Sequence, residues 1–136
     1  MNRERAKEYD AILDQISDTL DDMPKWTTSE ARRREVFKHV HDSIDGVTEL
    51  SAMLLKDLGQ EVGNEEDDLL ALEEQGVLEE ELVERIRKAY ALRDQIRAEN
   101  VQMDGVTLME ALEQAKFTVS DFCNVVDEVV DEQVEE

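Results

Sequence analysis

The segment FKHVHDSIDGVTELSAMLLKDL, residues 37–58, decides the fold class. Its apolar positions follow one another at steps of three and four residues, which is the spacing of one face of an α-helix. No segment of the chain shows the alternation of a β-strand. The stripe comprises Phe37, Val40, Ile44, Val47, Ser51, Leu54 and Leu58. It predicts a long helix over about 29–58, in which Gly46 permits close helix packing or a bend.

Four other segments carry the same helical spacing, over about 2–22, 65–75, 79–100 and from 107 onward. A loop over 24–29 follows the first of them. The segments are bounded by turn and capping residues, so each is expected to be a separate helix.

Caps define the two less obvious helices. Asn64 with Asp67 forms a capping pair at the start of the short helix, and Gly76 ends it as a C-cap. Thr107 with Glu110 has the pattern of a capping box, which predicts that the last helix starts there.

Together these elements predict one all-α domain over residues 1–136. It is an antiparallel bundle of four long helices with one short inserted helix. The core spans about 29–130, the helix at 2–22 packs on the bundle, and the acidic tail 131–136 frays.

The last helix carries more apolar side chains than a monomer requires, Val129 and Val130 among them. We therefore expect a homodimer.

The chain is strongly acidic, with 36 acidic and 15 basic residues and a formal net charge of -21. Such a charge fits a nucleic-acid mimic, an ordinary solvated surface, or a protein adapted to a cytoplasm at molar salt. The acids are spread along the whole chain, which favours the halophilic interpretation. At ~1 M salt the screening length is about 3 Å, so the charge does not exclude an RNA partner.

Cysteine usage and hydropathy indicate the compartment. The single cysteine, Cys123, permits no internal disulfide and lies in an apolar helical stretch, where we expect a small core residue rather than a nucleophile. The N-terminal segment is too charged for a signal peptide, and no apolar run approaches the ~20 residues of a membrane span. A cytoplasmic protein is expected.

The sequence predicts no metal or cofactor. Helical bundles hold di-iron centres with Glu-x-x-His pairs, and neither His39 nor His41 follows a glutamate by three residues. The two histidines lie two apart on one predicted helix and therefore point in different directions. Surface or packing roles are expected for both.

Ten of the 15 basic residues fall in two short segments. The first holds Lys25, Arg32, Arg33, Arg34 and Lys38, and the second holds Arg85, Arg87, Lys88, Arg93 and Arg97. If the two helices bring these faces together, they form a cationic patch that suits a phosphate-bearing partner. The alternative is that the arginines pair with the abundant carboxylates.

Arg93 occupies a position in the apolar stripe of its helix, and Arg97 follows one turn later. A buried arginine needs a carboxylate partner or a wet cleft. Burial of Arg93 therefore indicates either an interface or a functional groove.

The stretch LEEQGVLEEELVERIRKAYALRDQI, residues 72–96, resembles the HepT-like branch of the HEPN superfamily. The similar features are a short helix, a Gly-Val-Leu turn at 76–78, and a helix that bears an arginine followed by a polar residue. The resemblance covers roughly residues 29–130.

This resemblance implies a dimeric helical bundle that acts as a ribonuclease toxin. The family signature is Arg, four residues, His, any residue, Tyr. The Arg and His of two subunits face a shared cleft and cut RNA without a metal. The Tyr is where a partner nucleotidyltransferase, MntA, attaches AMP and neutralises the toxin.

This chain departs from the signature at the proton-transfer positions. The arginine is Arg93, and Asp94 stands where Asn is usual. Ala98 replaces the His, and Asn100 replaces the Tyr. Alanine cannot transfer a proton, and arginine stays protonated, although it can still stabilise phosphate charge. Asn100 has no hydroxyl to accept AMP.

We therefore expect a HepT-like protein with a degenerate ribonuclease centre, which binds RNA, a nucleotide or an MntA-like nucleotidyltransferase. Arg93 is the residual catalytic position, and the binding residues are Arg93, Arg97, Asp94 and Asn100. Two alternatives stay open: an active metal-independent ribonuclease toxin that tolerates the lost His, and a structural or regulatory dimer without a ligand. His39 and His41 are the histidines that could substitute for the lost His, but they belong to a different helix.

Overall fold

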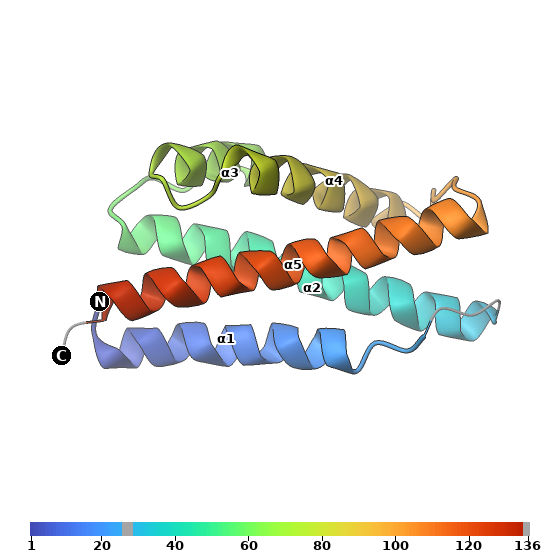
Figure 1. Cartoon of the computed structure of the whole chain (residues 1–136), viewed down its shortest axis with the longest axis horizontal. Coiled ribbons are helices and arrows are strands. Elements are labelled where there is room, and N and C mark those ends of the chain that lie inside the picture. The colour runs from blue at the N-terminus through green and yellow to red at the C-terminus, as the bar shows by residue number, and fades with distance from the viewer. Residues whose placement is uncertain (26–28, 135–136) are drawn as a thin grey trace.

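The computed structural model describes residues 1–25 and 29–134, and these residues form five helices and no strand. The helices are α1 (Arg3–Asp21), α2 (Glu30–Asp57), α3 (Glu65–Glu74), α4 (Glu80–Arg97) and α5 (Gly105–Gln133). The four long helices run antiparallel to their neighbours in the chain, and α3 is short (Figure 1). The predicted all-α bundle with an inserted short helix is confirmed. Part of the predicted 24–29 loop, 26–28, lies outside the described residues.

Helix α2 lies at the centre of the bundle, packed against each of the other four helices. In Figure 1, α5 crosses α2 and separates α1 from α4, while α3 and α4 cover the opposite side of α2 from α1. The predicted stripe explains this position, because its residues from Val40 to Leu54 are all buried. The fully buried side chains around it include Tyr9, Leu50, Leu69, Leu72, Ile86 and Phe122.

Gly46 allows α1 to approach α2 closely. A Cβ atom at this position would lie 2.5 Å from Cδ1 of Ile16, which is itself buried. The close approach predicted at Gly46 is therefore present.

The short helix has the predicted caps. The side chain of Asn64 accepts a hydrogen bond from the Asp67 backbone N–H at 2.8 Å. Gly76 has a φ of 77°, and the next N–H, of Val77, donates to the carbonyl of Leu72 at 3.0 Å. This is the left-handed C-terminal turn for which glycine is the favoured residue.

The start of α5 differs from the prediction. The helix begins at Gly105, and Asp104 is its N-cap, accepting a hydrogen bond from the Thr107 N–H at 2.8 Å. A carboxylate caps a helix at least as well as a threonine hydroxyl and also interacts favourably with the positive end of the helix dipole. Thr107 is thus a donor within the first turn rather than the cap.

The C-terminal ends of α4 and α5 also differ from the prediction. Helix α4 stops at Arg97, not near residue 100, because Glu99 adopts a left-handed φ of 54°. Helix α5 continues to Gln133, so the first half of the expected fraying tail is helical, and 135–136 lie outside the described residues. Val130 is buried and Val129 packs on the core, so the fold itself accounts for these two residues.

Candidate phosphate-binding site

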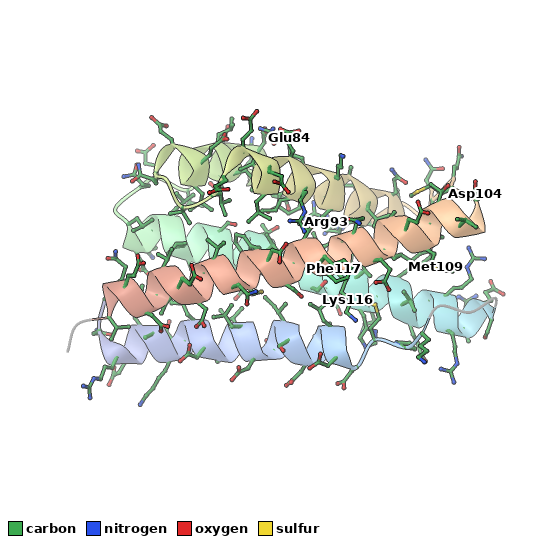
Figure 2. The ribbon with its side chains drawn as sticks, viewed as in Figure 1. Glu84, Arg93, Asp104, Met109, Lys116 and Phe117 are labelled. Carbon is green, nitrogen blue, oxygen red and sulfur yellow. The ribbon has the colours of Figure 1, made fainter. Side chains whose placement is uncertain are left out.

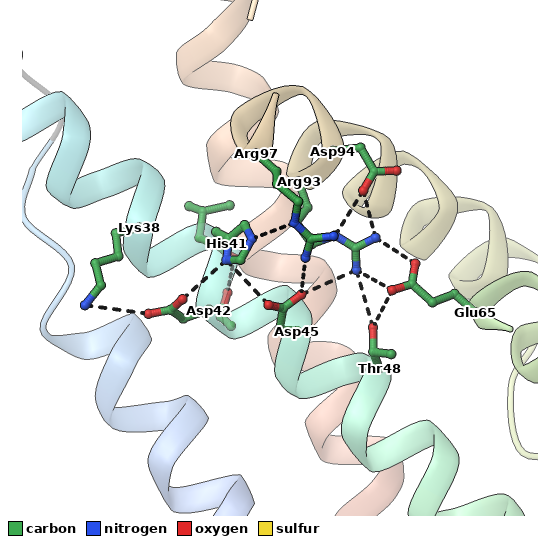
Figure 3. Close-up of polar contacts among 11 residues, drawn as sticks. Lys38, His41, Asp42, Asp45, Thr48, Glu65, Arg93, Asp94 and Arg97 are labelled. Carbon is green, nitrogen blue, oxygen red and sulfur yellow. Dashed lines mark hydrogen bonds and ion pairs between the residues drawn. The ribbon is translucent and has the colours of Figure 1, made fainter. Parts of the chain in front are cut away.

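Arg93 projects from α4 into the junction of α2, α3 and α4, and only 3% of its side chain is exposed. Its Nη1 and Nη2 donate to the two carboxylate oxygens of Glu65 at 2.6 and 2.7 Å (Figure 3). Nε and Nη2 also donate to Asp94, at 3.2 and 2.9 Å, and Nη1 reaches the Thr48 hydroxyl at 3.4 Å. The planar guanidinium is therefore held by three helices at once.

All five N–H groups that a guanidinium carries have acceptors within the chain. The Arg93 carbon between the nitrogens also lies 4.9 Å from the centre of the Tyr90 ring, a cation–π distance. Hydrogen bonding to Glu65 raises the pKa of Arg93, outweighing the opposing effect of burial, so the charge is permanent. In this conformation Arg93 is a structural clamp, and a phosphate reaches it only if Glu65 withdraws.

Arg97, one turn further along α4, is the accessible arginine, with 55% of its side chain exposed. Its Nε–H donates to Nε2 of His41 at 3.2 Å, and its Nη2 donates to Asp45 at 3.2 Å (Figure 3). These contacts join α4 to α2 at the edge of the Arg93 cluster. Because they lie at the surface, water and salt compete with them, and each contributes little to stability.

His41 lies between Arg97 and two carboxylates of its own helix. Its Nδ1 is 3.3 Å from Asp42 and 3.5 Å from Asp45. Since Nε2 accepts a hydrogen bond from Arg97, the neutral ring carries its proton on Nδ1, facing these carboxylates. The geometry fixes one tautomer and leaves an accepting nitrogen beside the accessible arginine.

The outward face of α2 continues this site toward the start of the helix. Arg34, Lys38 and His41 follow at steps of four and three, so they share one face. Arg34 pairs with Glu30 at 3.1 Å and Lys38 with Asp42 at 4.0 Å, both exposed pairs within one helix. Such pairs are worth about 0.3–0.5 kcal/mol, so a polyanion displaces them readily.

The other expected site residues are placed differently. Asp94 holds Arg93, whereas Asn100 lies exposed beyond the end of α4 and accepts a hydrogen bond from Gln102 at 3.0 Å. Ala98 is the exposed C-cap residue of α4. The structure thus brings Arg93, Asp94 and Arg97 together and leaves Asn100 outside the cluster.

The second basic segment forms ion pairs rather than an open patch. Arg85 pairs with Asp121 of α5 at 2.8 Å, and Arg87 with Glu66 of α3 at 2.6 Å. The alternative of pairing with carboxylates is therefore the one observed for the arginines of α4. Arg97 differs from them in its exposure and in its neighbour His41.

The two histidines of α2 have different surroundings. Nδ1 of His39 lies 2.6 Å from the Glu35 carbonyl of its own helix, which satisfies it locally. Sequence reasoning gave His41 no leading role, although its spacing from Lys38 and Asp45 places all three on one helical face. The residue that completes the cluster, Arg97, is 56 positions away.

A groove between α1 and α5 is a poorer phosphate site. Its lining includes four aspartates, Asp10, Asp14, Asp21 and Asp127, against one lysine, Lys116. Cys123 also lines it, and burial raises the pKa of this thiol to about 11, so the nucleophilic thiolate is scarce at neutral pH.

Within the described ranges, no group of three His, Cys, Asp or Glu side chains is arranged to hold a metal ion. None of the helices described is both long and apolar enough to cross a membrane.

The chain is similar to two proteins of Archaeoglobus fulgidus, each named "Putative RNase". The first is 28% identical over 131 residues, which cover 96% of this chain and 97% of that protein. The second is 31% identical over 87 residues, covering 64% of this chain and 66% of that protein. No protein-family model and no solved structure matches the chain. The chain is thus similar, over nearly its full length, to an archaeal protein named as an RNase.

Proposed function

We propose that this chain is a ribonuclease-like protein of the HepT type that binds single-stranded RNA across α2 and α4. Arg97 contacts the phosphate, and Arg93 holds the end of α4 in the position that presents it. The observation that carries the proposal is the accessible Arg97 guanidinium beside His41, on the face of α2 that also bears Lys38. Similarity to archaeal proteins named as RNases supports RNA as the ligand.

The canonical cleavage centre of the HepT type is degenerate here. Position 98 is alanine, and it lies at an exposed helix end rather than in the arginine cluster. The catalytic role expected for Arg93 is therefore reduced to electrostatic support from within the clamp.

The resemblance to HepT-like proteins also implies two protein partners, a second copy of the chain and a nucleotidyltransferase. A homodimer is supported by Val106, Met109 and Phe117, large apolar side chains exposed on α5. A toxin–antitoxin pairing with an MntA-like nucleotidyltransferase would rest on binding alone, because Asn100 cannot accept AMP through a hydroxyl.

RNA affinity tests the proposal. Fluorescence anisotropy of a labelled single-stranded RNA is followed across a salt series for the parent, Arg97→Gln and Arg85→Gln. Arg85 is the matched control, an ion-paired arginine of the same helix that faces α5. Arg97→Gln should weaken binding and lower the salt slope by about 0.7, the value for one lost phosphate contact on a single strand.

Equal affinity and slope for the parent and Arg97→Gln would overturn the placement of the site. An equal loss in Arg85→Gln would show a response to net charge alone. No RNA binding by the parent would leave the structural or regulatory dimer as the function.

A further inference from the structure

We propose that His41 replaces the missing catalytic histidine: it accepts the 2′-hydroxyl proton of a bound RNA while Arg97 holds the adjacent phosphate. The chain would then cleave single-stranded RNA without a metal. This inference rests on the proposed function and adds a reaction to it.

The first argument is position. Acid–base cleavage of RNA needs a proton acceptor within hydrogen-bond reach of a hydroxyl whose neighbouring phosphate is held by a cation. Nε2 of His41 accepts a hydrogen bond from Nε–H of Arg97 at 3.2 Å, so the candidate base and the candidate phosphate ligand are adjacent. They come from α2 and α4, and neither helix alone carries the pair (Figure 3).

The second argument is the tautomer. The Nδ1 side of His41 faces Asp42 and Asp45, which favours a proton there and leaves the Nε2 lone pair for the substrate. The same carboxylates stabilise the imidazolium that forms when Nε2 takes a proton, as the buried aspartate does in a catalytic triad.

The third argument is the exposure of Arg97. Its side chain is exposed, and its contacts to His41 and Asp45 lie at the surface. A phosphate offers Arg97 a stronger, bidentate acceptor than an imidazole nitrogen. When Arg97 turns to the phosphate, it vacates Nε2 of His41 and leaves Asp45 to balance the imidazolium charge.

His39, the other histidine of α2, is the natural contrast. It lines a hollow between α1 and α2 together with Asp14, Asp18, Asp22, Lys38 and Asp42, and no arginine is among the described lining residues. Its Nδ1 is held by the Glu35 carbonyl. His39 is therefore expected to take no part in the reaction.

The reaction balances without a further reactant. The 2′-hydroxyl proton passes to Nε2 of His41, and the 2′ oxygen forms a bond to phosphorus. The bond from phosphorus to the 5′ oxygen breaks, and that oxygen takes a proton from water. The resulting hydroxide removes the proton from the imidazolium, leaving a 2′,3′-cyclic phosphate on one fragment and a 5′-hydroxyl on the other.

Charged groups surround His41 on both helices. Asp42 and Asp45 flank the ring on α2, where Lys38 pairs with Asp42, and Arg97 contacts the ring from α4. Arg93 lies 3.6 Å from Asp45 on the inner side of the cluster.

The experiment compares the parent, His41→Gln and His39→Gln on a fluorescent single-stranded RNA in high salt with EDTA present. The parent and His39→Gln should cleave at the same rate, and His41→Gln should be slower by about 10²–10⁴-fold. An RNA with 2′-deoxyribose at the cleavage position should stay intact. Anisotropy on the same samples should show that His41→Gln still binds RNA, so that its loss lies in the cleavage step, and circular dichroism should show that all three proteins are folded.

The outcomes separate this inference from the function on which it rests. A parent that binds RNA but does not cleave it would overturn the role of His41 and leave RNA binding standing. Equal cleavage by His41→Gln and the parent, or an equal loss in His39→Gln, would also overturn it. If the parent does not bind RNA, both the role of His41 and the proposed function are wrong.

Discussion

Arg93 of α4 and Glu65 of α3 face each other through two parallel hydrogen bonds, of 2.6 and 2.7 Å. The arginine is almost wholly enclosed, whereas 34% of the Glu65 side chain is exposed. The pair fastens the inserted helix to the bundle at the point where α2, α3 and α4 meet. It also determines which of the two arginines near the end of α4 is accessible, because the clamp occupies Arg93 and leaves Arg97 exposed.

The first prediction concerns the strength of this clamp. Glu65→Gln should lower the free energy of unfolding by about 1–3 kcal/mol, since it weakens hydrogen bonds to a buried charge. Arg93→Met leaves Glu65 without its partner, but Glu65 can turn toward water. The variant should therefore lower the free energy of unfolding by less than an unpaired charge in the core would. The double variant should be more stable than the sum of the two single effects implies. Urea unfolding in high salt measures all three.

Arg87→Gln is the matched control, since Arg87 pairs with Glu66 across the same two helices at the surface. It should change stability little. A loss as large as that of Glu65→Gln would mean that burial of the pair makes no difference.

The sequence predicted much of the fold because helical spacing and caps are local signals. The stripe of α2 and the burial of Arg93 follow from steps of three and four residues. The sequence did not identify Glu65 as the partner of Arg93, because Glu65 lies 28 positions away and is one of 36 acidic residues. The His41–Arg97 contact depends on how α2 and α4 cross, which no local pattern encodes.

The second prediction concerns the end of α4, where Glu99 has a φ of 54°. The turn around it is closed by the Asn100 N–H donating to the Gln95 carbonyl at 2.9 Å. A left-handed conformation costs a side chain about 1–2 kcal/mol, and glycine avoids this cost but loses more chain entropy. Glu99→Gly should therefore raise the free energy of unfolding by about 0.5–1 kcal/mol in urea unfolding. Glu99→Ala keeps the strained φ and should give no such gain; equal gains in both would point to the lost charge instead.

The third prediction concerns the acidic surface. Burial and then the neighbouring carboxylates, Asp131 and Asp10 foremost, raise the pKa of Asp127. A raised carboxyl pKa means that the folded state holds its proton to higher pH than the unfolded state. The stabilising contribution of Asp127 to the free energy of unfolding is therefore fully present below the unfolded pKa of about 3.9. It is lost as pH rises through the folded pKa.

Asp127→Asn should therefore unfold at a higher temperature than the parent at pH 7 in low salt. The difference should shrink below about pH 4 and also in molar salt, where carboxylate repulsion is screened. Asp121→Asn is the control on the same helix, because it removes the partner of Arg85 and should not stabilise. A parent that is equally stable at low and molar salt would argue against the halophilic interpretation of the charge of -21.

The fourth prediction concerns the homodimer. Phe117 is 56% exposed, and it lies with Met109 on the outward side of α5 (Figure 2), where both side chains leave apolar surface in water. Their positions and that of Val106 differ by steps of three and eight residues, which keeps them near one face of the helix. If this face is the dimer interface, Phe117→Glu should place a charge in it and shift the protein toward monomer.

Light scattering after size-exclusion chromatography in high salt measures the mass of the parent and the variant. Val62→Glu is the matched control, because Val62 is also an exposed apolar residue but lies in the α2–α3 connection. The parent and Val62→Glu should have the mass of a dimer and Phe117→Glu that of a monomer. A monomeric parent would contradict the homodimer itself, whereas a dimeric Phe117→Glu would place the interface on another face. Because Arg97 and His41 lie on the α2–α4 face, the monomeric variant should still bind RNA if one chain carries the complete site.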